Sequence, residues 1–246
     1  MGNTSAQWFE NWFDSPYYHI LYQHRNFDEA ELFIDNLIQL LHPAAHSQFL
    51  DLACGKGRHS IYLNKKGYTV TGIDLSQESI NCASRFENKT LEFYVHDMRK
   101  PFRINYFDSV LNLFTSFGYF ENKRDDIATI DAVYKALKPN GIFVLDFLNV
   151  HKAVSNLIPE ESKIVDGIKF TINKSIEDDF IVKHIHFSDK GKEYHFQECV
   201  KMLTLNDFEN YFTAKKFKIV HLKGNYQLDD FDPKTSDRLI LIAQKK

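Results

Sequence analysis

The chain has 246 residues, of which 43% are hydrophobic, and its 30 basic and 33 acidic side chains leave a net charge of −3. This length is enough for one large α/β domain with a substantial core. The near balance of charge argues against a general electrostatic grip on nucleic acid, which needs a basic excess or a basic face. We therefore expect no nucleic-acid partner.

Three scattered cysteines, Cys54, Cys82 and Cys199, form no CxxC pair. Such a set argues against a disulfide framework and a zinc site, and it is typical of a reducing compartment. The His184/His186 pair lacks further ligands, so no metal is expected there either. No secretory signal opens the chain, and no apolar run approaches the roughly 20 residues that span a bilayer. The expectation is a cytoplasmic protein without a membrane partner.

Residues 1–45 are predicted to form a helical segment rich in aromatic side chains. Ser15-Pro16 is typical of an N-cap followed by proline at the first helical position, and it opens a short helix to about His24. A second helix is predicted over 28–41. Its buried side is expected to carry five apolar residues, Leu32, Phe33, Leu37, Leu40 and Leu41.

Residues 46–150 alternate between strand and helix patterns, which indicates a parallel sheet with helices on both faces. The turn between the last helix and the fifth strand is predicted at Lys138-Pro139-Asn140-Gly141. The strands are predicted at 48–52, 69–73, 91–95, 109–114 and 142–147, and the helices at 57–66, 77–86 and about 125–137.

The pattern changes over 151–203, where alternation from about residue 163 predicts an inserted antiparallel sheet of about three strands. An alternating sheet must bury one face, against the main domain or a second subunit, and we favour a homodimer. Residues 204–246 return to the core with a helix that begins near Thr204. Two closing strands, 218–222 and 239–243, are expected to pair in antiparallel fashion.

The strongest chemical signal is the run Phe49-Leu50-Asp51-Leu52-Ala53-Cys54-Gly55-Lys56-Gly57-Arg58. An apolar strand leads to an acid, then to a Gly-x-Gly turn and a helix. Glycines suit such a turn because the backbone must bend tightly and let a ligand approach main-chain N–H groups. A dinucleotide fingerprint would continue to a third glycine or alanine, but Ser60 stands there. The acid ahead of the glycines suits a ligand that carries an ammonium group.

Two further acids follow neighbouring predicted strands. Asp74 follows the glycine loop by roughly the 20 residues that place an acid on a ribose in related sites. Asp97, in His96-Asp97-Met98, follows the third strand. Open α/β sheets bind ligands at the carboxyl ends of their strands, so all three acids are expected at one edge.

This constellation resembles the class I S-adenosylmethionine-dependent methyltransferases, over about residues 46–150 and the closing strands. The resemblance implies a Rossmann-like sheet of seven strands with an antiparallel last strand, and S-adenosylmethionine as cofactor. It places the methionine end of the cofactor at Asp51 and the glycine loop, the ribose at Asp74 and the adenine amino group at Asp97. The loop residues are Ala53, Cys54, Gly55 and Gly57.

The resemblance also implies that Leu75 and Met98 pack beside the adenine and that Leu113 and Phe114 line the methyl-donor site. Related enzymes carry a lid ahead of the first strand, and here Tyr22 and Arg25 are its expected cofactor contacts. Lys138-Pro139-Asn140-Gly141 is similar to the Pro-x-Gly turn of this family.

We expect in-line methyl transfer to a small-molecule acceptor. Asn112-Leu113-Phe114-Thr115 lacks the Asn/Asp-Pro-Pro-aromatic motif that nucleic-acid amino-methyltransferases often carry after the fourth strand. The sequence leaves open whether N, O, S or C is methylated, and it names no general base. Two alternatives stay open: a non-catalytic S-adenosylmethionine-binding module and an NAD-dependent oxidoreductase, against which the missing third glycine counts.

Overall fold

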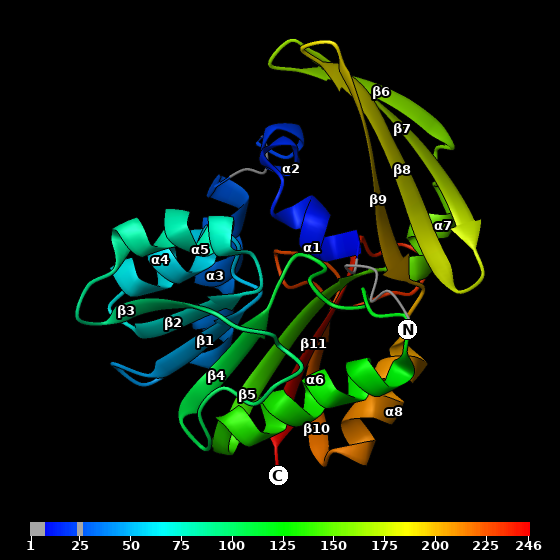
Figure 1. Cartoon of the computed structure of the whole chain (residues 1–246). Helices are drawn as coiled ribbons and strands as arrows, with labels where there is room; N and C mark the ends of the chain where they lie inside the picture. The colour runs from blue at the N-terminus through cyan, green and yellow to red at the C-terminus, as the bar shows by residue number, and fades with distance from the viewer. Residues whose placement is uncertain (1–7, 24–26) are drawn as a thin grey trace, which may run out of the picture. The chain divides into compact units, whose positions relative to one another are not determined.

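The structure, a computed structural model, describes residues 8–23 and 27–246 (Figure 1). The chain divides into two compact units. Unit 1 comprises Met1–Arg25 and Val154–Met202, and unit 2 comprises Asn26–Ala153 and Leu203–Lys246. Helix α7 (Val150–Ser155) crosses the boundary between them.

Unit 2 contains a seven-stranded sheet in the order β10-β11-β5-β4-β1-β2-β3. Strands β1 to β5 pair in parallel, and β11 runs antiparallel to both of its neighbours. The Rossmann-like sheet with an antiparallel last strand is therefore confirmed. The strands are β1 Gln48–Leu52, β2 Thr69–Asp74, β3 Leu91–Val95, β4 Phe107–Asn112, β5 Leu137–Leu148, β10 Phe217–Lys223 and β11 Arg238–Lys245.

Helices cover both faces of this sheet (Figure 1). On one face lie α3 (Phe27–Leu41), α4 (Arg58–Lys65) and α5 (Gln77–Ala83), with the short 3-10 helix η1 (Ser84–Phe86) after α5. On the other face lie α6 (Lys123–Ala136) and α8 (Leu205–Ala214).

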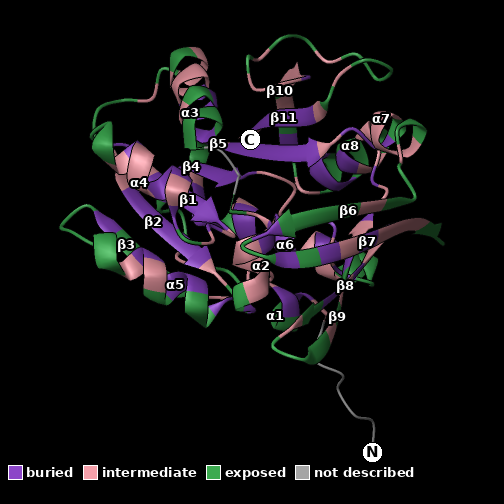
Figure 2. Ribbon diagram, turned by 90° about the horizontal axis from the view of Figure 1, so that it is seen from above, coloured by how far each residue is buried: buried purple, intermediate pink, exposed green. Residues whose placement is uncertain are grey.

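The core of unit 2 is built from the two faces of the central strands. Val144 of β5 joins the cluster formed with α3 and α4, whereas Phe143 and Phe147 point to the other side. The ring of Phe143 lies 5.7 Å from Phe212, and that of Phe147 lies 5.2 Å from Phe208, both on α8. Figure 2 shows these central strands as buried. A parallel sheet covered on both faces needs nearly continuous apolar strands, and residues 142–148 of β5 are apolar except for Asp146.

One residue of the predicted buried stripe on α3 is exposed. Leu32 has 42% of its surface accessible, whereas Ala30, Phe33, Ile34 and Leu37 are buried. The buried positions follow the i, i+3, i+4, i+7 spacing of one helix face, and Leu32 falls outside it. Leu40 and Leu41 are half-buried against the core.

The predicted turn at 138–141 lies within the bounds of β5. Phe107 pairs with Leu137 and Ser109 with Ile142, so a five-residue step on β5 opposes a two-residue step on β4. Asn140 has a φ of 63°. The turn residues thus form a bulge inside a longer strand, and the prediction that β5 begins at residue 142 was wrong.

Unit 1 contains α1 (Trp8–Phe13), α2 (Pro16–Leu21) and a four-stranded antiparallel sheet. Ser15 caps α2 by accepting a hydrogen bond from the backbone N–H of Tyr17, and the predicted end at His24 lies outside the described residues. The sequence analysis expected about three strands, and the structure has four. The additional strand, Glu160–Val165, is mostly polar and shows no clear alternation that would have predicted it. The strands are β6 Glu160–Val165, β7 Ile168–Glu177, β8 Phe180–Asp189 and β9 Lys192–Lys201.

The apolar face of this sheet packs against the N-terminal helices of its own unit. Trp12 is fully buried, with its ring 4.7 Å from that of Phe196 on β9. Tyr17 lies 4.6 Å from Phe187 and 4.7 Å from Tyr194, again between ring centroids. The face that the sequence required to be buried therefore has a partner within unit 1.

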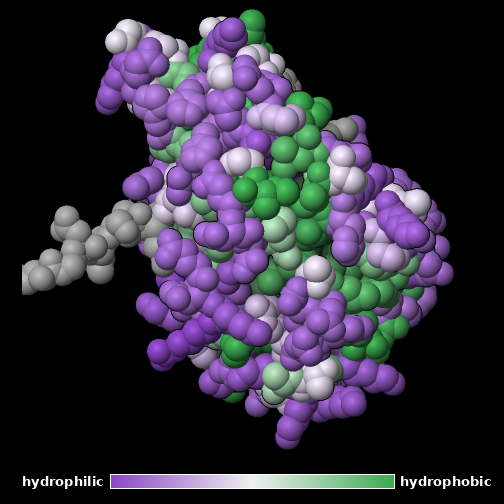
Figure 3. All heavy atoms as spheres, turned by 90° about the vertical axis from the view of Figure 1, so that its right-hand side faces the viewer, coloured by the Kyte–Doolittle hydropathy of each residue, from purple (hydrophilic) through white to green (hydrophobic). Residues whose placement is uncertain are grey.

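Hydrophobic side chains also reach the surface. Figure 3 shows a face on which they gather between larger hydrophilic areas. In unit 1 the large exposed apolar residues are Ile158, Ile164 and Ile176. In the described part of the chain, no helix has both the length and the apolar character that crossing a membrane requires.

Candidate functional site

The loop after β1 combines a left-handed backbone with an open flank. Ala53, Gly55 and Gly57 have φ values of 62°, 56° and 80°. A Cβ atom added to Gly55 would meet nothing within 4 Å, so a ligand can approach the backbone there. Glycine adopts such angles without steric cost, whereas Ala53 adopts one as a non-glycine residue.

Gly57 is required by close packing. A Cβ atom on it would lie 2.7 Å from the ring of Phe93 and 3.3 Å from Ala83. Gly72 on β2 faces the same ring, at 2.5 Å. The two glycines let the loop and β2 approach Phe93 of β3 closely, and α4 begins directly after Gly57.

Asp74 lies beside the glycine loop. Its Oδ2 accepts a hydrogen bond of 2.8 Å from the backbone N–H of Gly55, and its Oδ1 accepts one of 2.9 Å from that of Ser76. Ser76 in turn caps α5 by accepting from the backbone N–H of Ser79. The structure therefore brings together the acid and the loop that the sequence analysis linked, and two backbone groups fix the carboxylate.

Asp51 lies beneath the loop, with only 1% of its surface accessible. Ser60 Oγ donates a hydrogen bond of 2.6 Å to its Oδ2. Burial raises the pKa of the Asp51 carboxyl from 3.8 to about 6; the Ser60 hydrogen bond opposes this shift, and the charge of Asp74 adds to it. Ser60, which stands where a dinucleotide fingerprint has its third small residue, thus holds the buried acid.

The thiol of Cys54 is packed into the core cluster of unit 2. Only 6% of the residue is accessible, and burial raises the pKa of the thiol well above its ordinary value. A thiol in this state is a poor nucleophile. Cys54 can therefore offer a ligand its backbone rather than its side chain.

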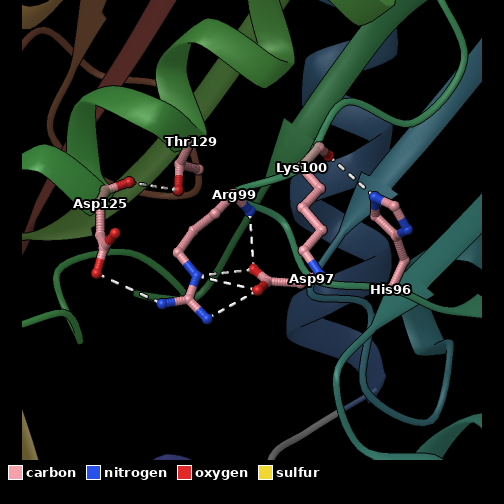
Figure 4. A network of polar contacts seen from close by, with 6 residues as sticks. All are labelled: His96, Asp97, Arg99, Lys100, Asp125 and Thr129. Atoms are coloured by element: carbon pink, nitrogen blue, oxygen red, sulfur yellow. Dashed lines mark hydrogen bonds and ion pairs between the residues drawn. The ribbon is translucent and has the colours of Figure 1, made fainter.

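Asp97 is held by its neighbour Arg99 (Figure 4). Its Oδ1 accepts from the backbone N–H and Nε of Arg99, at 2.9 and 3.0 Å. Its Oδ2 accepts from Nε and Nη2, at 3.0 and 2.7 Å. Arg99 Nη1 also reaches Asp125 Oδ2 on α6, at 3.4 Å. Burial opposes ionisation, but the hydrogen bonds and charge of Arg99 lower the pKa of Asp97 overall.

These contacts bear on the expected adenine role of Asp97. A carboxylate offers about four acceptor positions, and Arg99 makes four contacts with this one. An adenine amino group would have to share them or displace the guanidinium. The two expected apolar neighbours of the adenine differ in exposure, since Leu75 is 38% accessible and Met98 is half-buried.

The segment after β4 has an unusual backbone. Phe114 and Thr115 have φ values of 57° and 58°, a conformation that costs a non-glycine residue about 1–3 kcal/mol. Leu113 is 3% accessible and lies in the core, so its side chain is less available to a ligand than that of the half-buried Phe114. The Phe114 backbone N–H donates to Asp146 Oδ2 at 2.7 Å.

Three residues at this place were missed by the sequence analysis. Asp146 of β5 is fully buried and accepts from Arg238 Nε at 2.7 Å. Tyr226 OH donates to Asp146 Oδ2 at 3.3 Å, and Arg238 Nη2 donates to Thr115 Oγ1 at 2.8 Å. An acid near the carboxyl end of an otherwise apolar strand was the available signal for Asp146.

Of the two predicted lid contacts, only Tyr22 is among the described residues, and it lies in unit 1. Tyr22 OH donates a hydrogen bond of 2.7 Å to Glu198 Oε1 on β9, and Arg25 lies outside the described residues. In the described residues no three His, Cys, Asp or Glu side chains are grouped to hold a metal. His184 pairs with Glu177, and His186 contacts His195 across the strands.

A family model described as a methyltransferase domain matches residues 50–145, the stretch that carries the glycine loop and the three acids. This match identifies a methyltransferase domain within the chain, similar to the class I S-adenosylmethionine-dependent methyltransferases. Its cofactor is S-adenosylmethionine. The site fits this group, since the open flank of Gly55, the fixed carboxylate of Asp74 and the exposed Leu75 share one edge of the sheet.

Individual relatives agree with this family. A putative methyltransferase, YqeM of Bacillus subtilis, is 36% identical to this chain over 118 residues. The match covers 47% of each protein, so the chain spans about half the length of this relative. A dTDP-3-amino-3,4,6-trideoxy-alpha-D-glucopyranose N,N-dimethyltransferase of Streptomyces venezuelae is 26% identical over 78% of this chain and 83% of its own. A methyltransferase structure from Clostridium acetobutylicum superposes with a TM-score of 0.78 at 19% identity, covering 93% of this chain and 96% of that one.

Proposed function

We propose that the protein transfers the methyl group of S-adenosylmethionine to a small-molecule acceptor, with an amine as the first acceptor to test. The name of the Streptomyces venezuelae relative describes methylation of a sugar amine, which supports this acceptor class. The balanced charge of the chain supports it too, since a nucleic-acid substrate normally demands a basic surface.

One observation carries the proposal. Asp74 is fixed at the carboxyl end of β2 by the backbone N–H of Gly55, within the loop that a ligand can approach. A carboxylate in this place accepts hydrogen bonds from both ribose hydroxyls of an adenosyl ligand, and charge-assisted bonds are the stronger kind. Asp51 beneath the loop would favour the ammonium group at the methionine end.

The remaining edge of the sheet would hold the adenine. Leu75 and Met98 would pack on its faces. Asp97 would accept a hydrogen bond from the adenine amino group once Arg99 gives up part of its contacts with Asp97. Arg99 also reaches Asp125, so α6 offers the guanidinium a second carboxylate.

The bound cofactor supplies a methyl group already activated by the positive charge on sulfur. The contribution of the chain is then to bind, align and shield. Alignment of two reactants can contribute as much as about 7–11 kcal/mol in favourable cases. A side chain that removes a proton is needed only if the acceptor must lose one before attack.

Tyr22 and Arg25 remain proposed cofactor contacts. The Tyr22 hydroxyl is engaged with Glu198, so we propose that its ring rather than its hydroxyl meets the positive sulfonium. The inserted sheet is proposed to belong to the acceptor site or to a homodimer interface. Its apolar face already has a partner in α1 and α2, so it does not by itself demand a second subunit.

Calorimetric titration with S-adenosylmethionine, S-adenosylhomocysteine and NAD tests the proposal, followed by product detection in a screen of small amines, hydroxyl compounds and thiols. We expect micromolar binding of both adenosyl ligands, none of NAD, and a methylated amine. Binding without any product would favour a non-catalytic binding module. NAD binding with no response to either adenosyl ligand would overturn the proposal.

A further inference from the structure

A buried ion pair ties three separate segments of unit 2 together. Asp146 has no accessible surface and lies near the end of β5. Arg238, the first residue of β11, donates Nε to Asp146 Oδ1 at 2.7 Å. Its Nη2 donates to Thr115 Oγ1 at 2.8 Å. One guanidinium therefore joins β5 to the segment after β4.

The second oxygen of Asp146 holds the same segment by its backbone. Oδ2 accepts from the Phe114 N–H at 2.7 Å, and the Thr115 N–H donates to the Asp146 carbonyl at 3.0 Å. Both residues have positive φ values, of 57° and 58°. A β-branched residue such as threonine rarely adopts this conformation unless its surroundings impose it. Asp146 and Arg238 provide that constraint.

The ring of Phe114 contacts the side chains of Tyr226 and Arg58. Tyr226, in the connection between β10 and β11, stacks on it with ring centroids 4.9 Å apart and an angle of 27°. The Arg58 guanidinium lies 4.0 Å from its centroid. Tyr226 OH also donates to Asp146 Oδ2 at 3.3 Å. The carboxylate thus positions the backbone of Phe114 and one of the side chains that orient its ring.

Resting on the proposed function, we propose that Asp146 and Arg238 are positioning residues, which hold Phe114 and Thr115 in the left-handed conformation that shapes the methyl-donor end of the cofactor site. Neither needs to touch the cofactor. Their effect passes through the Phe114 N–H and the Thr115 hydroxyl. Tyr226 assists by stacking on the Phe114 ring.

The test is the affinity for S-adenosylhomocysteine, measured by calorimetry on full-length variants well below their unfolding temperatures. Asp146→Asn retains the shape but replaces one acceptor oxygen with a donor, so we expect roughly tenfold weaker binding or more. Arg238→Lys retains the charge but cannot reach Asp146 and Thr115 with one planar group, so we expect an intermediate loss. Tyr226→Phe removes only the hydroxyl and should have the smallest effect.

A matched control lies at the other end of β4. Asp108 also accepts from one backbone N–H, that of Gln48 at 2.8 Å, and from one cation, Lys138 Nζ at 2.7 Å. Asp108→Asn makes the same chemical change away from the site, at a more exposed position, and should leave the affinity within about twofold of the wild type.

The outcomes separate this inference from the proposed function. Wild-type protein that fails to bind S-adenosylhomocysteine contradicts the proposed function. Wild-type binding, with folded Asp146→Asn and Arg238→Lys proteins that bind equally well, overturns the positioning role alone. If Asp146→Asn does not fold, Arg238→Lys and Tyr226→Phe decide, and unchanged affinity in both overturns it.

Discussion

A buried carboxylate of unit 2, Asp146, and one of unit 1, Glu198, have similar partners and a different effect. Asp146 in unit 2 accepts from an arginine, a tyrosine hydroxyl and a backbone N–H. Glu198 in unit 1 accepts from Lys183 Nζ at 2.9 Å, Tyr22 OH at 2.7 Å and Trp12 Nε1 at 2.8 Å. Burial opposes ionisation of Glu198, but its partners lower its pKa overall.

The difference lies in what the partners belong to. The groups that hydrogen-bond to Asp146 come from the segments that form the candidate site, so the Asp146–Arg238 ion pair shapes a loop. Two partners of Glu198 belong to the N-terminal segment: Trp12 lies on α1, and Tyr22 directly follows α2. The Glu198 cluster therefore attaches residues 8–23 to the four-stranded sheet of unit 1. Removing one partner of a buried pair is costly in either place, because the other is left uncompensated. The comparison predicts loss of affinity in unit 2 and loss of stability in unit 1.

The largest effect is expected for Glu198→Ala. It leaves Trp12, Tyr22 and Lys183 without their shared acceptor, and we expect a loss of about 3–5 kcal/mol in the free energy of unfolding. Hydrogen exchange in α1 and α2 should accelerate. Binding of S-adenosylhomocysteine should change by less than about threefold, because most expected contacts lie in unit 2.

Glu193→Ala is the matched control on the same strand, since Glu193 is exposed. Its effect should stay within about 0.5 kcal/mol. Equal destabilisation by both substitutions would show that the buried cluster contributes nothing beyond the loss of one charge on β9.

Next in size is Asp74→Ala. Loss of charge-assisted hydrogen bonds to the ribose, worth about 1.5–3 kcal/mol, should weaken S-adenosylhomocysteine roughly 10–150-fold in calorimetry. The fold should persist, although the Gly55 N–H also loses its acceptor. Asp74→Asn retains one acceptor oxygen, so its affinity should lie between those of the wild type and Asp74→Ala. Unchanged affinity in Asp74→Ala would reduce this acid to a loop and cap residue.

The third prediction concerns pH and Asp51. Its folded-state pKa of about 6 exceeds the ordinary 3.8, so the folded chain binds the proton more tightly than the unfolded one. Its contribution to the free energy of unfolding therefore falls as pH rises from about 4 to about 6. An ammonium ligand favours the ionised acid, so binding should weaken about tenfold from pH 7 to pH 5.

Calorimetry of S-adenosylhomocysteine binding across that pH range is the measurement, with Asp51→Asn as the control. The variant cannot titrate at this position, and its affinity should vary much less between pH 5 and pH 7. Wild type and variant with parallel pH profiles would assign the dependence to another group.

The smallest effect is expected for Tyr22. Tyr22→Phe keeps the ring and should leave S-adenosylhomocysteine affinity unchanged, while costing about 1 kcal/mol of stability through the lost Glu198 hydrogen bond. Tyr22→Ala removes the ring as well. If the ring meets the cofactor, S-adenosylmethionine, which carries the sulfonium, should lose about two- to fivefold more affinity than S-adenosylhomocysteine. Equal losses for both ligands would contradict that contact.

The parts of the fold that the sequence predicted well have strong local signals. The bounds of β1 and β3 match, because each is a short apolar strand with a clear end. The glycine loop and Asp74 meet as expected, since both lie at the carboxyl ends of parallel neighbouring strands. The first strand of unit 1 was missed because most of Glu160–Val165 is accessible and carries no alternation.

The residues that the sequence did not reveal depend on distant partners. Asp146 and Arg238 are 92 positions apart, and only the antiparallel pairing of β11 with β5 brings them together. The contact between Asp97 and Arg99 is local, yet a carboxylate and a guanidinium two positions apart also occur on solvated surfaces. Which of these pairs shapes a site depends on burial and packing, and these follow from the complete fold.

The Glu198 cluster also bears on the order in which the protein can form during its synthesis. Trp12 and its acceptor are 186 positions apart along the chain. At elongation rates of about 5–20 residues per second, the ribosome needs about 10–40 s to cover that distance. Throughout this interval the tryptophan and tyrosine rings of 8–23 lack the strands on which they finally pack. The N-terminal helices therefore wait through this interval for the strand that buries Trp12, which exposes an aromatic segment to chaperones or to neighbouring nascent chains.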